Sequence, residues 1–208
     1  GSTEVGKILY RQSADTIKKL TLELGGNAPL IVFDDADLAR AVSSTMASKF
    51  RNAGQTCVCA NRILVQSGIY DRYIAALKVA IGHLHVAPGR DPRSTIGPLI
   101  NADAISKVKS LLMDATARGA KIELGGAPDE QGPLFFSPTI VTGVSPGMAI
   151  ANEEIFGPVA SIIRFETEED AIRIANDTPY GLAAYLFSQD ISRAWRVAEA
   201  LESGMVGI

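Results

Sequence analysis

The feature that most constrains the fold is a regular alternation of short apolar runs with longer amphipathic segments. The apolar runs have the length of strands, and they lie at 28–33, 63–65, 159–165 and 183–187. Most are followed by a segment in which apolar residues recur at helical spacing. Strands that alternate with helices of about ten or more residues are typical of parallel sheets. The sequence therefore predicts an α/β fold, with a largely parallel sheet and helices on both faces.

Polar residues precede several of the helical segments. Asn101, Thr167 and Asp190 are each placed to accept a hydrogen bond from the first turn of a helix. The segment 1–7 is expected to be a glycine-bearing turn that opens a first helix, which continues through Leu9 towards Leu20. The last helix is expected to bury a face made of Ile191, Trp195, Ala198 and Leu201.

Composition excludes several classes of function. The chain has 208 residues, 47% of them hydrophobic, and a net charge of -3 with the charges interspersed, so nucleic acid is not expected as a partner. No apolar run approaches the roughly 20 residues of a membrane span. The two cysteines are separated by one residue, which predicts no disulfide framework and favours a reducing compartment, the cytoplasm. His83 and His85 have no Cys or His cluster to join, so no metal is expected.

Both cysteines lie in one segment, 50–62, between a helical pattern and a strand. A thiol on such a loop can be aimed into a cleft, and Cys57 becomes a nucleophile if its thiolate is favoured. The alternative is that Cys57 and Cys59 are two buried structural thiols.

Three other groups of charged side chains could contribute to a site. Glu23 could act as a general base if it is buried, although a glutamate on a strand is more often solvated. Arg51 and Arg62 could each bind a carboxylate, although most single arginines form surface ion pairs. Glu153 and Glu154 are adjacent, so in an extended segment only one of them would enter a cleft.

Four motifs in order resemble the aldehyde dehydrogenase superfamily over nearly the whole chain. The segment 23–27 (Glu-Leu-Gly-Gly-Asn) resembles the glutamate signature of that family, and 54–57 (Gly-Gln-Thr-Cys) resembles its cysteine signature. The segment 153–158 resembles a third family motif, and 1–6 resembles the turn that contacts the cofactor phosphates, which implies that Gly1 and Ser2 are native residues.

The resemblance implies the fold of an aldehyde dehydrogenase catalytic domain and a mechanism. Cys57 would form a thiohemiacetal and then a thioester with the aldehyde, and Glu23 would activate the water that hydrolyses the thioester. NAD or NADP is the implied cofactor. The residues that would bind it are Gly1, Ser2, Gly6, Leu24, Gly25, Glu154 and Phe156.

The longer segment 50–62 resembles succinate-semialdehyde dehydrogenases, in which the position of Arg51 holds the distal carboxylate of the substrate. Glutarate semialdehyde, or another acid semialdehyde, is the alternative substrate. A non-catalytic module on the same fold, and an acylating or thioesterase-type enzyme using the same cysteine, are the alternative functions. Cys59 is unusual in this position, and it suggests a reversible disulfide with Cys57.

The resemblance also implies a division of the chain. Residues 1–24 are expected to be the end of a cofactor-binding domain, and residues 25–208 a catalytic domain truncated before a C-terminal oligomerisation segment. The full-length protein is expected to form a homo-oligomer, and the isolated chain is expected to have little or no dehydrogenase activity.

Overall fold

The protein is built on one seven-stranded sheet, and its structure, a computed structural model, describes residues 1–208. The strand order is β3-β4-β5-β2-β1-β6-β7, and every neighbouring pair is parallel except β3 and β4. The strands are β1 (Ala28–Val32), β2 (Ala60–Gln66), β3 (Lys121–Leu124), β4 (Thr139–Thr142), β5 (Val159–Phe165), β6 (Ala183–Phe187) and β7 (Met205–Gly207). The expected largely parallel sheet is confirmed.

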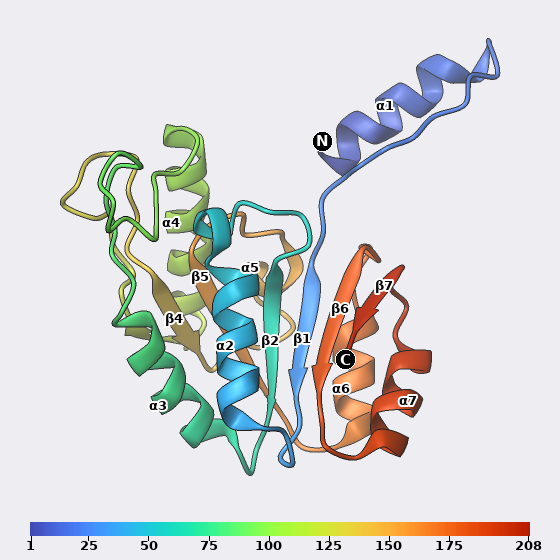
Figure 1. Cartoon of the computed structure of the whole chain (residues 1–208). Coiled ribbons are helices and arrows are strands. Elements are labelled where there is room, and N and C mark those ends of the chain that lie inside the picture. The colour runs from blue at the N-terminus through green and yellow to red at the C-terminus, as the bar shows by residue number, and fades with distance from the viewer.

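Helices cover both faces of this sheet. In Figure 1, α2 and α3 lie in front of it, while α4, α5 and α6 lie behind, with α7 packed beside α6. The helices are α1 (Thr3–Ala14), α2 (Leu38–Lys49), the short 3-10 turn η1 (Arg51–Gly54), α3 (Tyr70–Ile81), α4 (Ala102–Ala117), α5 (Ala149–Asn152), α6 (Glu168–Asn176) and α7 (Ile191–Ala200). None of the helices has both the length and the apolar character that crossing a membrane requires.

The central strands are buried on both faces, as in other sheets covered by helices on two sides. β1 is buried along its whole length, and β2 is buried up to its last residue. The predicted N-caps are also present: Asn101, Thr167 and Asp190 each accept a hydrogen bond from a backbone N–H in the first turn of the helix that follows.

Some boundaries and faces differ from the sequence predictions. α1 ends at Ala14, and the chain from there to β1 forms no further helix or strand. α5 was not predicted, because a single helical turn shows no periodicity. The face of α7 was predicted only in part: Leu201 is buried and Ala198 packs against the core, but Ile191 and Trp195 are 67% and 58% exposed. Ala194 and Val197 are buried instead.

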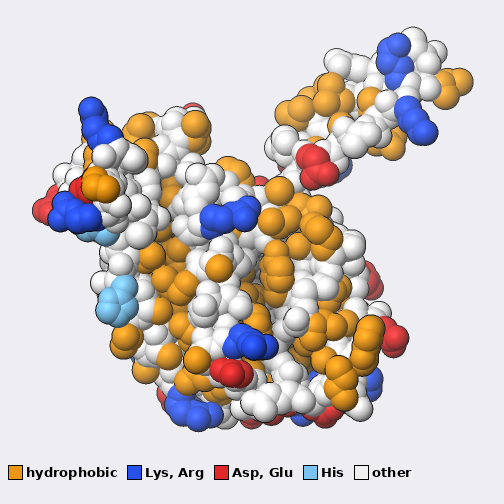
Figure 2. Space-filling model, in the orientation of Figure 1, with side chains coloured by type: hydrophobic (Ala, Val, Ile, Leu, Met, Phe, Trp, Pro, Cys, Tyr) orange, Lys and Arg blue, Asp and Glu red, His pale blue; other side chains and the backbone are white.

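The segment 1–24 stands apart from the sheet. Figure 1 shows α1 projecting away from the body and connected to β1 by an extended stretch. Apolar side chains of α1 are exposed, among them Val5, Ile8, Leu9 and Tyr10. Figure 2 shows hydrophobic side chains on the projecting arm.

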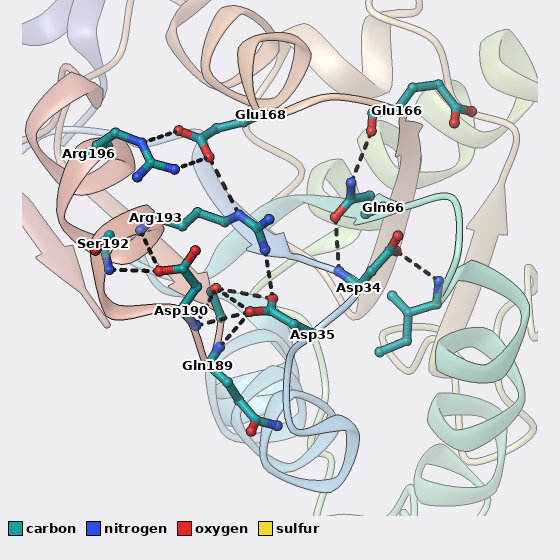
Figure 3. A network of polar contacts seen from close by, with 12 residues as sticks. Asp34, Asp35, Gln66, Glu166, Glu168, Gln189, Asp190, Ser192, Arg193 and Arg196 are labelled. Carbon is teal, nitrogen blue, oxygen red and sulfur yellow. Dashed lines mark hydrogen bonds and ion pairs between the residues drawn. The ribbon is translucent and has the colours of Figure 1, made fainter.

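The carboxyl ends of the parallel strands are closed by side chains that bind one another (Figure 3). Asp35, which follows β1, accepts hydrogen bonds from the hydroxyl of Ser188 and the backbone N–H of Asp190, and it pairs with Arg193. Gln66, at the end of β2, accepts from the backbone N–H of Asp34 and donates to the carbonyl of Glu166. These contacts connect the carboxyl ends of β1, β2, β5 and β6. The loops that carry the sequence motifs lie at the opposite, amino ends of the strands.

Candidate active site

The cysteine loop connects α2 to β2 and has an unusual backbone. Asn52, Ala53 and Gly54 are consecutive residues with φ values of 51°, 55° and 75°. The left-handed conformation costs a non-glycine residue about 1–2 kcal/mol, so tertiary contacts must hold this turn. The turn reverses the chain between the end of α2 and Cys57.

Side chains from other elements clamp this loop. Gln55 donates to the carbonyl of Pro98 and accepts from the N–H of Ile100. On the other side, the Tyr185 hydroxyl of β6 donates to the Val58 carbonyl at 2.7 Å, next to Cys57. Burial raises the pKa of Tyr185, which keeps this hydroxyl a hydrogen-bond donor. The thiol of Cys57 is therefore carried by a loop anchored on both sides.

The glutamate segment approaches the cysteine loop at its glycines. A Cβ atom at Gly26 would overlap the carbonyl oxygen of Cys57, so only glycine fits there. The N–H of Gly26 donates to Glu154 Oε1 at 3.0 Å, and a Cβ at Gly25 would come within 2.9 Å of Glu154 Oε2. The segment 153–158 also contacts the cysteine loop directly. A Cβ atom at Gly54 would overlap the carbonyl oxygen of Gly157.

A buried polar cluster fixes these segments relative to one another. The Asn61 amide donates to Asn27 Oδ1 at 2.6 Å and to the Glu153 carbonyl at 2.9 Å, while its oxygen accepts from the Ile155 N–H. Asn27 and Asn61 are both buried, with exposures of 2% and 1%. This cluster was not predicted, although Asn27 and Asn61 both lie in segments that the sequence identified, 23–27 and 50–62.

Arg62 belongs to the same cluster, and its expected role as a carboxylate ligand or a surface ion pair is wrong. It is 2% exposed, and its guanidinium donates to the carbonyls of Asn27, Ile174 and Ala175. Burial lowers the pKa of Arg62 to about 10, an effect partly opposed by Asp177. Arg62 therefore holds the backbone at Asn27 against α6 and has a structural role.

A cavity of about 690 Å³ brings most of the predicted site residues together. Its lining includes Gly1, Ser2, Glu23, Leu24, Gly25, Arg51, Cys57, Glu154 and Phe156. Ala104 and Lys107 of α4 also line it and were not predicted, since their spacing is that of an ordinary helix. Gly6 does not line the cavity and packs against the side chain of Leu24.

Glu154 and Glu153 point in different directions, as predicted for an extended pair. Glu153 has φ -107° and ψ 143°, and its side chain is exposed outside the cavity, whereas Glu154 lines it. Glu23 also lines the cavity, but it is exposed rather than buried.

A second cavity, of about 530 Å³, lies on the other side of the cysteine loop between α2 and β6. Figure 2 shows hydrophobic side chains gathered on this face of the molecule. Arg51, Thr56 and Val58 line both cavities, whereas Cys57 lines the first and Cys59 the second. Both cysteines are free thiols.

This arrangement suits covalent chemistry on an electrophile. A half-buried thiol and an exposed carboxylate share one cavity, and a guanidinium marks the boundary to a second cavity. The thiol can add to a carbonyl carbon, the carboxylate can activate water, and the guanidinium can bind an anionic group of the same molecule.

Known proteins resemble this chain over its full length. The family model "Aldehyde dehydrogenase family" matches residues 1–208. A protein of Arabidopsis thaliana named "Succinate-semialdehyde dehydrogenase, mitochondrial" is 58% identical over 100% of this chain and 39% of its own length. A "Glutarate-semialdehyde dehydrogenase" of Pseudomonas aeruginosa is 50% identical over 100% of this chain and 43% of its own length.

A solved structure described as an E. coli NADP dependent enzyme superposes with a TM-score of 0.99 at 54% identity, over 100% of this chain and 43% of that one. The chain thus spans less than half the length of the relatives it matches. The match to the family model covers every residue, and the chain belongs to the aldehyde dehydrogenase family.

Proposed function

We propose that the protein containing this chain oxidises an acid semialdehyde to the dicarboxylic acid with NAD or NADP, and that succinate semialdehyde is its substrate. The observation that carries the proposal is the cavity in which Cys57, Glu23, Glu154 and Arg51 meet. The names of the relatives support the same class of reaction.

Cys57 is the proposed nucleophile. Its sulfur adds to the aldehyde carbon to give a thiohemiacetal, and oxidation of that carbon leaves a thioester. Glu23 takes a proton from the water that attacks the thioester, and the acid leaves as Cys57 is restored. The exposed position of Glu23 allows water to reach it. The pair also favours hydrolysis over the alternative of an acylating enzyme.

The residues of the cavity fit a nicotinamide dinucleotide, which supplies the acceptor for the hydride when it is bound. Glu154 lies over the backbone of Gly25 and offers carboxylate oxygens to sugar hydroxyls. Gly1 and Ser2 line the same cavity at the N-terminus of α1, where Ser2 is the N-cap, and a helix N-terminus favours a phosphate. Leu24, Gly25 and Phe156 line the same cavity.

Arg51 is the proposed ligand of the distal carboxylate. It is exposed at the boundary of the two cavities, on the turn that precedes Cys57. A guanidinium there would bind the acid end of a short chain whose aldehyde end reaches the thiol. Glutarate semialdehyde, one methylene longer, is the alternative substrate, supported by the name of one relative.

The arrangement of the chain supports the division expected from its sequence. The projecting segment 1–24 would belong to the cofactor-binding domain, and 25–208 to the catalytic domain. We also propose a homo-oligomeric full-length protein. The two unpaired cysteines favour a reducing compartment such as the cytoplasm.

The experiment measures reduced cofactor formation by the longer protein that contains this chain. Succinate and glutarate semialdehydes are compared with butanal and pentanal, each with NAD and with NADP, for the parent, Arg51→Ala and Arg40→Ala. Arg40 lines only the second cavity, so it is the matched control. Losing one charge-assisted hydrogen bond should lower kcat/KM for the semialdehydes about 10- to 100-fold.

The outcomes separate the parts of the proposal. A selective loss for the semialdehydes in Arg51→Ala, with butanal and pentanal unchanged, supports Arg51 as the carboxylate ligand. Equal activity on all four aldehydes in parent and variant removes the substrate assignment but leaves the reaction. Cys57→Ser with undiminished activity would remove the mechanism.

A further inference from the structure

Lys49 is a buried amine with no carboxylate partner. It is the last residue of α2, its exposure is 0%, and it takes part in none of the ion pairs of the structure. Buried lysines are rare unless they are paired, because removing the charge from water is costly. The one polar partner of Lys49 Nζ is Cys59 Sγ, at 3.7 Å.

Cys59, in the cysteine loop, lies between this amine and the left-handed turn at 52–54. It is 4% exposed, and its Sγ donates to the carbonyl of Gly54 at 3.3 Å. The sulfur therefore contacts an amine on one side and the left-handed turn on the other. Neither Lys49 nor Cys59 has a role in the reaction proposed for Cys57.

The surroundings of Cys59 admit a small oxidant. Cys59 lines the 530 Å³ cavity between α2 and β6, whereas Cys57 opens into the other cavity. A peroxide can thus reach Cys59 without passing Cys57. The burial of the sulfur excludes bulky thiols that would otherwise cap an oxidised cysteine.

We propose that Lys49 and Cys59 form an oxidative modification site at which a peroxide produces a covalent nitrogen–sulfur link. In the first step the sulfur of Cys59 attacks the peroxide, the O–O bond breaks, and a sulfenic acid and water are formed. In the second step the neutral amine of Lys49 attacks this sulfur, and the S–O bond breaks. A second water leaves, and a sulfenamide remains. The peroxide is the two-electron oxidant, and Cys59 is the group oxidised.

Geometry favours the amine over Cys57 as the trapping group. A disulfide between Cys57 and Cys59 requires suitable Cβ positions in residues separated by one position, on a loop held by Tyr185 and Gln55. The flexible four-carbon stem of Lys49 already brings its nitrogen to the sulfur. The link would tie the end of α2 to the start of β2 and leave Cys57 a free thiol.

The test is peptide mass analysis after peroxide treatment, alkylation and trypsin digestion. In the untreated protein trypsin cleaves after Lys49, and both cysteines lie in the peptide 52–62. The link should abolish cleavage at Lys49 and join the peptide 41–51 to 52–62, with a loss of two hydrogen atoms from their summed mass. Cys57 should stay a free thiol during peroxide treatment and should then be found alkylated. A reducing agent should restore the unlinked peptides.

Variants test whether Lys49 and Cys59 are the two linked residues. The mass readout does not depend on dehydrogenase activity. Cys57→Ser should still form the link, whereas Cys59→Ser and Lys49→Arg, which keeps the charge, should not. The proposal is overturned if the parent and Cys57→Ser yield no linked peptide while Cys59 is recovered as a thiol or a sulfinic acid. It is equally overturned if the parent yields the peptide 52–62 with an internal Cys57–Cys59 disulfide instead.

Discussion

A side chain on residue 26 would have to occupy the space of the Cys57 carbonyl oxygen. Gly26 and Cys57 therefore meet backbone to backbone, and the glutamate and cysteine segments touch with no side chain between them. Close approach of this kind is one of the uses of glycine that no other residue can replace. The separation of the proposed base and nucleophile depends on this contact.

Gly26→Ala should lower the free energy of unfolding by about 1–3 kcal/mol, the usual cost of overpacking a well-packed site. It should also change the rate at which Cys57 reacts with a thiol reagent. Gly89→Ala is the control, because Gly89 is exposed and a Cβ there meets nothing within 4 Å. Urea denaturation of both variants tests this, and equal stabilities would contradict the close contact.

Asn61→Ala should destabilise the protein by about 1–3 kcal/mol, because it leaves buried partners at Asn27, Glu153 and Ile155 unsatisfied. Asn152 provides a matched comparison. Its exposed amide also makes two hydrogen bonds, to the carbonyls of Pro146 and Met148, but water can replace them. Asn152→Ala should therefore cost less than Asn61→Ala, and the opposite order would show that the buried cluster is not what holds the motifs.

The burial of Tyr73 should make the free energy of unfolding depend on pH in the alkaline range. Its side chain is fully buried against Thr45, and burial raises the pKa of its hydroxyl, an effect partly opposed by that hydrogen bond. The folded protein therefore holds this proton more tightly than the unfolded chain does. As pH rises above about 10, the unfolded state loses the proton first and the free energy of unfolding falls.

Tyr73→Phe should make this fall shallower, which denaturation midpoints between pH 9 and about 11 would measure. The parent and the variant must be compared at each pH, because other tyrosines and lysines titrate in the same range. A parallel decline in the two proteins would rule out Tyr73 as a source.

Much of the fold follows from the sequence because its signals are local. The caps at Asn101, Thr167 and Asp190 and the alternation of strands with helices require only neighbouring residues. The face of α7 was predicted only in part, because Leu201 is buried as expected but Ala194 and Val197 pack in the core while Trp195 is exposed. Helical spacing alone does not show which of two apolar stripes meets the sheet.

The site was predicted unevenly for a related reason. Motifs identified the segments that carry Glu23, Cys57 and Glu154, and the structure brings these side chains to one cavity. The burial of Lys49 and Arg62 could not be predicted, since charged residues are expected at the surface and their partners are distant in sequence. The position of the motif loops at the amino ends of the strands depends on the completed sheet, and it departs from the usual placement of sites in open α/β sheets.

Glu23 and Cys57 are carried by different parts of the molecule. Cys57 is held by the sheet and its helices, whereas Glu23 lies on the extended connection to the projecting α1. Two half-reactions are proposed for the site. Acylation of the thiol depends on the loop that carries Cys57, and hydrolysis of the thioester depends on the connection that carries Glu23. A change that loosens the packing of α1 would leave an enzyme able to acquire an acyl group but slow to release it, so that acyl transfer to another nucleophile could compete with water.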